Sequence, residues 1–117
     1  MQANAQSDTL RFDSTVEDAD SIEYELIVLD PGYDLFLASQ PSMEFYSQEY
    51  YESWNFRYVT EWNYRHMQAH TFGDTYETYI DYRQNIDYGL ELNYKLYYYF
   101  RFFENEYNVK LLPERVF

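Results

Sequence analysis

Hydrophobic and polar residues alternate along the stretch from residue 21 to residue 30. The apolar members at every second position, interleaved with glutamates, are Ile22, Tyr24, Leu26 and Val28. This period-2 pattern predicts a half-buried β-strand over residues 22–29. Ile27 and Leu29 interrupt the alternation, so we expect both faces of the strand to be covered near its end. Pro31-Gly32 then supplies residues typical of a turn.

From residue 42 to residue 69 the chain has neither glycine nor proline, and the apolar positions change to helical spacing. At about 100° per residue, one stripe about 80° wide collects most of the large apolar side chains. The members of this stripe are Tyr51, Trp54, Tyr58, Trp62 and Ala69. Glu61 lies four residues from both Arg57 and Arg65, a spacing that favours ion pairs along a helix. The pattern predicts a long amphipathic helix.

Residues 75–82 alternate again, but the segment has two interpretations. A strand would place Tyr76, Thr78, Ile80 and Tyr82 on one face, whereas a helix would group Tyr76 and Ile80 with Tyr79 and Arg83. We favour a strand because β-favouring residues are frequent here. Residues 109–112 predict a further short strand, which Pro113 ends. A shorter apolar piece over residues 33–39 predicts one or two helical turns.

The stretch "NYKLYYYFRFFENEY", from residue 93 to residue 107, is dominated by aromatic residues. Asp87 is a candidate N-cap and Gly89 loosens the entry to a helix. On that helix one face carries Leu92, Leu96, Tyr99, Phe100, Phe103 and Tyr107. The opposite face carries side chains whose ends can reach water or hydrogen-bond partners: Tyr94, Tyr98, Arg101 and Asn105. The pattern therefore indicates core packing rather than a cofactor site.

Together these elements predict an α+β domain. Two long amphipathic helices pack on a small two- to three-stranded sheet around an aromatic-rich core. We assign residues 21–117 to a single globular domain, which is a length sufficient to bury one core. Residues 1–20 are acidic and poor in aromatic residues, so we assign them to a flexible leader.

Composition sharpens this picture. The chain contains 16 tyrosines, 9 phenylalanines and 2 tryptophans, so tyrosine hydroxyls must find partners or reach water. The formal net charge of −13 disfavours nucleic acids and anionic lipids, whose binding depends on Lys and Arg. The absence of cysteine excludes disulfides and thiolate metal sites. No apolar run approaches the roughly 18 residues of a transmembrane segment.

His66 and His70 form the one candidate metal site. On the predicted helix they lie one turn apart, and such a pair can supply two ligands to Zn²⁺, Cu²⁺ or Ni²⁺. Met67 occupies the position of the glutamate in the H-E-x-x-H motif, so the base of that metalloprotease class is missing. An exposed helix terminus, where histidine is favoured electrostatically, is the alternative interpretation. We expect no cofactor, because the chain has no phosphate-cradling glycine pattern.

Aromatic side chains outside the core are candidates for a binding surface. Phe56 and Tyr64 face away from the stripe that holds Trp54 and Trp62 on the predicted helix. Tyr46 and Tyr98 are further, weaker candidates. Such a surface would suit a carbohydrate or a protein partner, and it also leaves a homo-oligomer open.

Three stretches of the chain form a recognisable set: "YELIVLDPGYDLFL", "EWN" at residues 61–63, and "IDYGLELNYKLYYYF" at residues 86–100. In these stretches the chain resembles an uncharacterised Bacteroidetes family of unknown function. Members of that family often carry an N-terminal export or lipoprotein signal, so the resemblance implies a cell-envelope setting. Ala3-Asn4-Ala5 has the form of a signal-peptidase site, with a chance match in a polar leader as the alternative. The chain lacks the cysteine to which a lipid would be attached.

These observations lead to a functional prediction. We expect a non-enzymatic binding or interaction protein, exported to the cell envelope or periplasm, although a cytoplasmic location stays open. The alternatives are a metal-binding protein or hydrolase centred on His66 and His70, and a purely structural envelope component. For an enzyme, the residues offer neither a nucleophile elbow nor a specific pair of carboxylates.

Overall fold

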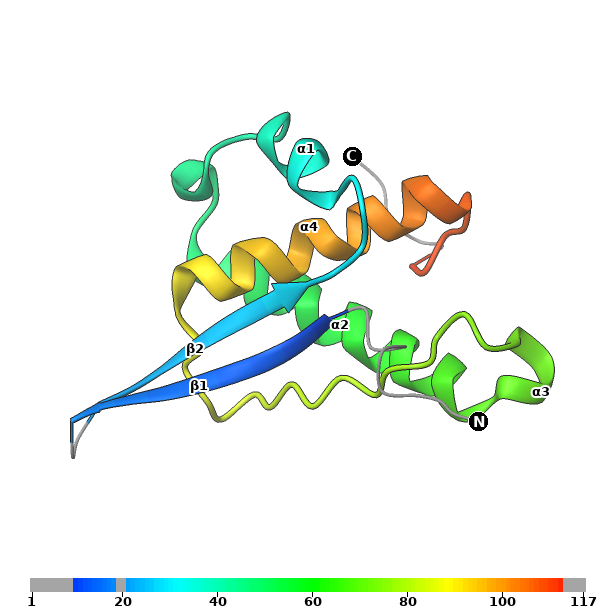
Figure 1. Cartoon of the computed structure of the whole chain (residues 1–117), viewed down its shortest axis with the longest axis horizontal. Coiled ribbons are helices and arrows are strands. Elements are labelled where there is room, and N and C mark those ends of the chain that lie inside the picture. The colour runs from blue at the N-terminus through cyan, green and yellow to red at the C-terminus, as the bar shows by residue number, and fades with distance from the viewer. Residues whose placement is uncertain (1–9, 19–20, 113–117) are drawn as a thin grey trace.

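The computed structural model describes residues 10–18 and 21–112, and only the backbone of residues 11, 13–18 and 21–23. Two strands come first, β1 (Leu10–Asp18) and β2 (Ser21–Val28), and the helical elements follow (Figure 1). The helical elements are α1 (Tyr33–Ala38), the 3-10 helix η2 (Met43–Phe45), α2 (Gln48–Met67), α3 (Ala69–Phe72) and α4 (Gly89–Tyr107). Within the described ranges, no helix has the length and apolar character needed to cross a membrane.

The hairpin of β1 and β2 packs one face against α4. In its antiparallel register Leu10 pairs with Val28, and Phe12 pairs with Leu26. Leu10 and Leu26 are buried, and β2 contacts α4 directly. Strand β1 lies inside the range that the sequence assigned to a flexible leader, residues 1–20. Its pairing with β2 was therefore not predicted.

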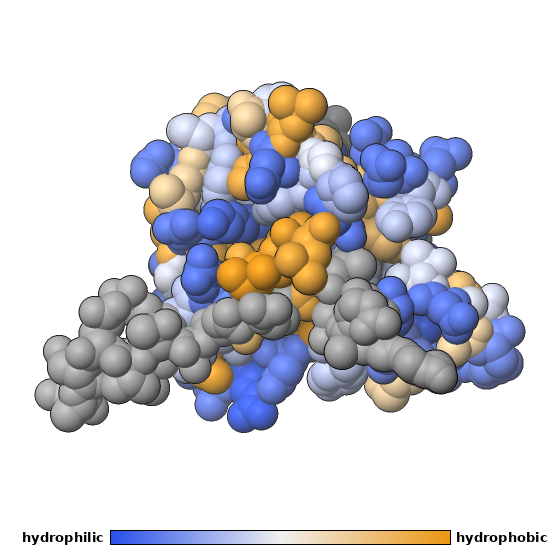
Figure 2. All heavy atoms as spheres, in the orientation of Figure 1, coloured by the Kyte–Doolittle hydropathy of each residue, from blue (hydrophilic) through white to orange (hydrophobic). Residues whose placement is uncertain are grey.

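The end of β2 is more open than the sequence indicated. Ile27 is half-buried, and Leu29, which follows the strand, is 56% exposed. Figure 2 shows hydrophobic atoms at the surface near the middle of the molecule, where Figure 1 places the end of β2. The expectation that both faces are covered here is wrong for Leu29.

Helices α2 and α4 pack against each other through aromatic rings. Tyr58 stacks on Phe100 with the ring centres 4.8 Å apart, and Trp62 meets Phe103 edge-on at the same distance. All four side chains are buried. Such pairs contribute about 0.5–1.5 kcal/mol each beyond the burial of their surface. The mixture of helix and strand and the aromatic-rich core are confirmed.

The long helix α2 starts later and ends earlier than predicted. Ser47 is its N-cap, and the Ser47 hydroxyl accepts a hydrogen bond of 3.1 Å from the Tyr50 N–H. The helix ends at Met67 because Gln68 has a non-helical backbone, with φ −113° and ψ 48°. Helix α4 starts at Gly89, where the Asp87 carboxylate accepts a 3.1 Å hydrogen bond from the Gly89 N–H. The N-cap itself is Tyr88 rather than the predicted Asp87.

Two of the three predicted strands are not strands. Residues 75 and 76 complete a turn after α3, residues 77–82 run back along α2 as an extended segment (Figure 1), and residues 109–112 form a bend after α4. The predicted sheet of residues 22–29, 75–82 and 109–112 is therefore not confirmed. The alternation in the second segment is nevertheless real, because Tyr76 and Ile80 are buried while Glu77 and Asp81 are exposed.

Candidate functional site

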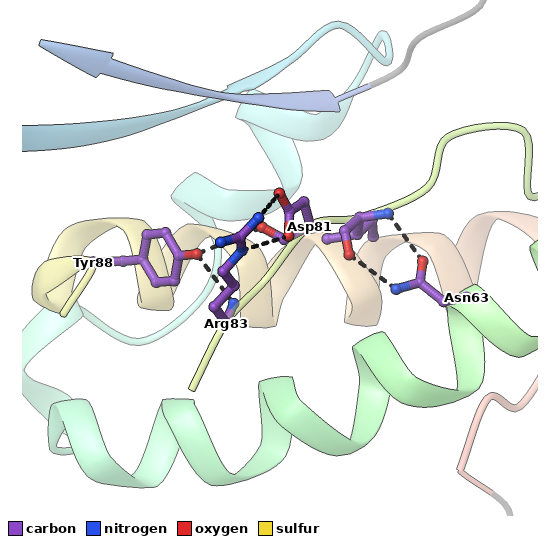
Figure 3. Close-up of polar contacts among 5 residues, drawn as sticks. Asn63, Asp81, Arg83 and Tyr88 are labelled. Atoms are coloured by element: carbon purple, nitrogen blue, oxygen red, sulfur yellow. Dashed lines mark hydrogen bonds and ion pairs between the residues drawn. The ribbon is translucent and has the colours of Figure 1, made fainter. Parts of the chain in front are cut away.

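We call residues 76–82 the strap, and side chains of α2 hold its backbone. The Asn63 amide donates to the Ile80 carbonyl at 2.9 Å, and its oxygen accepts from the Ile80 N–H at 2.9 Å. The Trp62 indole N–H donates to the Thr78 carbonyl at 2.7 Å. Figure 3 shows Asn63 of α2 turned toward the strap. The hydrogen bonds that a neighbouring strand would supply thus come from helix side chains, since buried backbone groups need partners.

The polar side chains at both ends of the strap are also paired. Arg83 forms an ion pair with Asp81 at 3.1 Å, and the Tyr88 hydroxyl accepts a 3.1 Å hydrogen bond from the Arg83 N–H (Figure 3). At the other end, Arg65 donates to Glu61 at 2.7 Å and to the Tyr76 hydroxyl at 3.0 Å. This side of the molecule uses its polar groups to hold itself together.

A buried polar network joins the strap to both long helices. The Asn55 amide of α2 donates to the Asn93 carbonyl of α4 at 2.9 Å. The Tyr82 hydroxyl of the strap donates to the Asn93 side-chain oxygen at 2.6 Å. Asn55 and Asn93 are both fully buried. The Asn55 side-chain oxygen has no hydrogen-bond partner among the described residues. The bonds that Asn55 and Tyr82 donate to Asn93 fix how the three segments align.

A groove opens on another part of α4, where the helix faces the segment that connects α1 to α2. Its volume is about 420 Å³, which lies within the range of ligand pockets. We call it the tyrosine groove after the aromatic residues that line it: Phe36, Tyr46, Tyr97 and Tyr98. Tyr46 is held in place by a stacked Tyr50, with ring centres 3.9 Å apart and planes 13° apart. The aromatic part of the groove is therefore rigidly packed.

Several polar atoms in the tyrosine groove have no hydrogen-bond partner among the described residues. The Tyr98 ring is buried, with the residue 4% exposed, and its hydroxyl lies at the groove wall without a hydrogen bond to the described residues. The Asn105 side chain, two turns further along α4, is likewise unbonded within these ranges. Gln40 uses its amide nitrogen on the Phe36 carbonyl at 3.3 Å, while its side-chain oxygen accepts no bond from the described residues. The groove thus contrasts with the strap, because the Tyr98 hydroxyl, the Asn105 amide and the Gln40 side-chain oxygen remain available.

The electrostatics of the groove favour neutral hydrogen-bonding groups. Burial raises the pKa of the Tyr98 hydroxyl, and the neighbouring Tyr97 and Tyr51 raise that pKa further. The hydroxyl therefore keeps its proton at neutral pH and can both donate and accept. Among the described residues, Arg101 is the one charged residue that lines the groove. It donates to the Tyr97 hydroxyl at 3.3 Å and lies 3.7 Å from Glu104.

Comparison with known proteins shows a family but no activity. Residues 2–114 match a family described as a family of unknown function (DUF6146). The chain belongs to this family. No curated protein and no solved structure matches it. The DUF6146 match covers all three stretches on which the sequence resemblance was based, so the resemblance to a family of unknown function is confirmed.

The structure assigns roles to two of those stretches in this DUF6146 chain. "EWN" supplies Glu61, which pairs with Arg65, together with the two residues that hold the strap, Trp62 and Asn63. "IDYGLELNYKLYYYF" supplies the first half of α4, including Asn93 and the groove residues Tyr97 and Tyr98. The motifs therefore mark both the structural strap and the groove.

The predicted histidine pair does not lie on one continuous helix. His66 belongs to the last turn of α2 and His70 to α3, with the break at Gln68 between them. The His66 Nδ1 lies 2.7 Å from the Tyr76 carbonyl, so this nitrogen carries the proton and holds the strap. His70 is exposed. Within the described ranges, no group of three or more His, Cys, Asp or Glu residues is placed to hold a metal ion.

The predicted surface residues separate into two places. Phe56 and Tyr64 lie on α2, 42% and 53% exposed, and neither lines the tyrosine groove. Tyr46 and Tyr98, the weaker candidates, come together in the groove. Arg101 and Asn105 could have been found from the sequence, because they share with Tyr98 the polar face of the last predicted helix. Gln40 carried no sequence signal, since it lies in an irregular segment next to Pro41.

Proposed function

We propose that this protein is a non-enzymatic binding protein and that the tyrosine groove holds its ligand, a carbohydrate or a segment of a protein partner. The observation that carries the proposal is the Tyr98 side chain, whose ring is buried while its hydroxyl, at the wall of the groove, makes no hydrogen bond with the described residues. A hydroxyl at the wall of a groove that the fold does not bond can hydrogen-bond to water or to a ligand. Asn105 and Gln40 add further unbonded atoms to the same groove.

The chemistry of the groove supports binding rather than catalysis. Its hydroxyl groups belong to tyrosines, and burial raises the pKa of Tyr98. A hydroxyl whose pKa is raised is a poor base and a poor nucleophile at neutral pH. The side chains around it are amides and one arginine, which are groups that orient a ligand through hydrogen bonds.

A titration followed by ¹H–¹⁵N NMR tests the groove as the binding site. Pools of oligosaccharides and of short peptides would be added to labelled protein. We expect chemical shift changes at Gln40, Tyr98 and Asn105 with at least one pool. The proposal is overturned if every pool leaves these signals unchanged, or if a ligand moves only signals around Phe56 and Tyr64.

We also propose that the protein works in the cell envelope. The support is the resemblance given above together with the Ala3-Asn4-Ala5 sequence. Fractionation of cells that carry the native gene, followed by immunoblotting, provides the test. We expect the protein in the periplasmic or envelope fraction, and recovery in the cytoplasmic fraction alone would contradict this part of the proposal.

A second candidate is a protein–protein contact through Phe56 and Tyr64, including contact with a second copy of the chain. Their exposure on the outer side of α2 favours it, because large exposed aromatic residues often mark interfaces. Light scattering coupled to size-exclusion chromatography should then show a dimer that Phe56→Ala weakens. A monomer at every concentration, with no protein recovered in an envelope pull-down, would contradict this candidate.

The metal-binding or hydrolase alternative has less support. What favours it is the hydrogen bond at the His66 Nδ1, which leaves Nε2 as a lone-pair donor for a metal. The interruption at Gln68 removes the one-turn spacing on which the pair was first proposed. If the alternative holds, Zn²⁺ should raise the melting temperature of the wild type but not of His70→Ala. Equal melting curves for both proteins with and without Zn²⁺ would end it.

A further inference from the structure

We infer that the ligand of the tyrosine groove is a neutral carbohydrate. This inference rests on the proposed function, because it names the chemical class of the molecule that the groove would bind. Three features of the groove lead to it: the type of its unbonded polar atoms, the secondary structure that surrounds it, and its charge.

The unbonded polar atoms match the hydroxyl groups of a sugar. The Tyr98 hydroxyl and the Asn105 amide can each donate and accept, and the Gln40 side-chain oxygen accepts. A sugar hydroxyl also donates and accepts, so a ring that carries several of them can satisfy all three residues. The aromatic surface of Phe36 and Tyr46 beside them offers an apolar contact for the C–H groups of the ring.

The walls of the groove are less suited to an extended peptide. Such peptides are commonly held through their main chain by the edge of a sheet. The groove is lined by residues of α1, α4 and the segment between α1 and α2, and none of the strand residues whose side chains are described lines it. Recognition in this groove must therefore proceed through side chains, which suits a ligand covered with hydroxyl groups.

The charge of the groove disfavours an acidic ligand. Arg101 is the one charged residue among the described residues of its lining, and Glu104, only 3.7 Å away, offsets that positive charge. The chain as a whole carries a formal net charge of −13, which repels anions at long range. A neutral sugar avoids this repulsion, whereas a uronic acid polymer would meet it.

The test is an NMR and calorimetric titration of the full chain with three probes. They are neutral oligosaccharides of glucose, mannose, galactose and N-acetylglucosamine, oligogalacturonate as the acidic counterpart, and a pool of short peptides. We expect a neutral oligosaccharide to move the signals of Gln40, Tyr98 and Asn105. Tyr98→Phe and Asn105→Ala should each weaken its binding about two- to tenfold, which corresponds to one lost hydrogen bond.

Asn85→Ala is the matched control, because Asn85 is an exposed asparagine in the loop before α4 and does not line the groove. It should leave the dissociation constant unchanged. The NMR spectrum of each variant without ligand shows whether the variant is folded, so weaker binding cannot be confused with loss of structure.

The outcomes separate the two levels of the proposal. If only oligogalacturonate or only a peptide binds in the groove, the ligand class is wrong while the groove remains the binding site. The ligand class is also wrong if a neutral oligosaccharide binds with the same affinity to wild type, Tyr98→Phe and Asn105→Ala. If none of the probes moves a groove signal at millimolar concentration, both the ligand class and the proposed function are overturned.

Discussion

The strap and the tyrosine groove are built from similar residues but use their polar atoms in opposite ways. Along the strap, Trp62, Asn63 and His66 of α2 all bond to the backbone of residues 76–80. In the groove, Tyr98 and Asn105 of α4 make no hydrogen bond with the described residues. Both regions contain aromatic and amide side chains, so residue type alone does not distinguish them.

This difference indicates that the strap side chains serve to stabilise the fold, whereas the unbonded groove side chains are free to bind a ligand. A satisfied hydrogen bond stabilises the fold modestly, while removal of one partner leaves the other group buried and unpaired. Substitutions along the strap should therefore destabilise the protein. Removal of the Tyr98 hydroxyl or of the Asn105 amide should leave stability intact, because the described fold does not bond these groups.

The largest effect is expected at Trp62. Trp62→Ala removes a buried ring between α2 and α4 together with the hydrogen bond to the Thr78 carbonyl. The free energy of unfolding should fall by about 3–5 kcal/mol, as for other large aromatic truncations. Urea denaturation followed by circular dichroism measures the change.

Trp62→Phe is the companion variant, because it keeps much of the ring and loses only the N–H donor. It should cost about 1–3 kcal/mol, since the Thr78 carbonyl is left without its partner. Equal stability of Trp62→Phe and wild type would show that this hydrogen bond does not hold the strap.

The second effect is expected at Asn63. Asn63→Ala removes both hydrogen bonds to the Ile80 backbone, one donated and one accepted. We expect a loss of about 2–3 kcal/mol and faster hydrogen exchange at the Ile80 amide. Asn85→Ala, at an exposed loop position, should stay within about 0.5 kcal/mol of wild type. If the Ile80 amide exchanges at the same rate in Asn63→Ala and in wild type, the Asn63 hydrogen bonds do not stabilise the strap, and the contrast between the strap and the tyrosine groove is wrong.

Asp30 should give a smaller, pH-dependent effect. It is intermediate between the hydrogen-bonded residues of the strap and the unbonded side chains of the groove. It has a partner, the Tyr99 hydroxyl at 3.1 Å, but remains half-exposed. Burial raises the pKa of Asp30 above its ordinary value of 3.8, and the charge of Glu106 raises it further, while the bond from Tyr99 opposes both. The folded state therefore holds the proton to a higher pH than the unfolded state.

The sign of the pH effect follows from this shift. Well below pH 3.8 the Asp30 carboxyl is protonated in both the folded and the unfolded state, so its titration does not change the free energy of unfolding. As the pH rises from there through the folded pKa, the unfolded state loses its proton first and the free energy of unfolding falls. Asp30→Asn should match wild type near pH 3 and be slightly more stable at pH 7. Urea denaturation of both proteins at pH 3 and at pH 7 measures this difference. The prediction is wrong if Asp30→Asn is less stable than wild type at pH 7 while the two proteins are equal at pH 3.

The smallest effect is expected in the groove. Tyr98→Phe removes a hydroxyl that the described fold does not use, so stability should change by no more than about 0.5 kcal/mol. The matched variant is Tyr33→Phe, because Tyr33 is equally buried but its hydroxyl donates to the Lys95 carbonyl at 2.6 Å. That variant should lose about 1 kcal/mol. Equal losses in both tyrosine variants would show that the Tyr98 hydroxyl has a partner and would remove the basis for a binding groove.

Local patterns predicted some elements correctly and others only in part. The periodicity of residues 92–107 identified α4 and its buried face, although Tyr107 is half-exposed at the helix end. The alternation of residues 75–82 identified an extended segment with one buried side, but not that helix side chains would bond to its backbone. The hairpin partner β1 was missed because charged and polar residues surround its few apolar positions.

The candidate site shows the same limit. The sequence placed Tyr98, Arg101 and Asn105 on one helix face, which the structure bears out in the groove. It could not show that Gln40 and Tyr46 meet that face, because they come from an irregular segment more than fifty residues away. Nor could it show that Gln68 ends the helix between His66 and His70.

The sequence by itself determined the aromatic core, the two long helices and the acidic character of this protein. These properties follow from residue type and from periodicity within single segments. Tertiary structure alone decided which polar atoms are used up and which remain available, because a hydrogen bond depends on groups brought together from distant parts of the chain. That is why the strap became a structural element and the tyrosine groove became the candidate binding site.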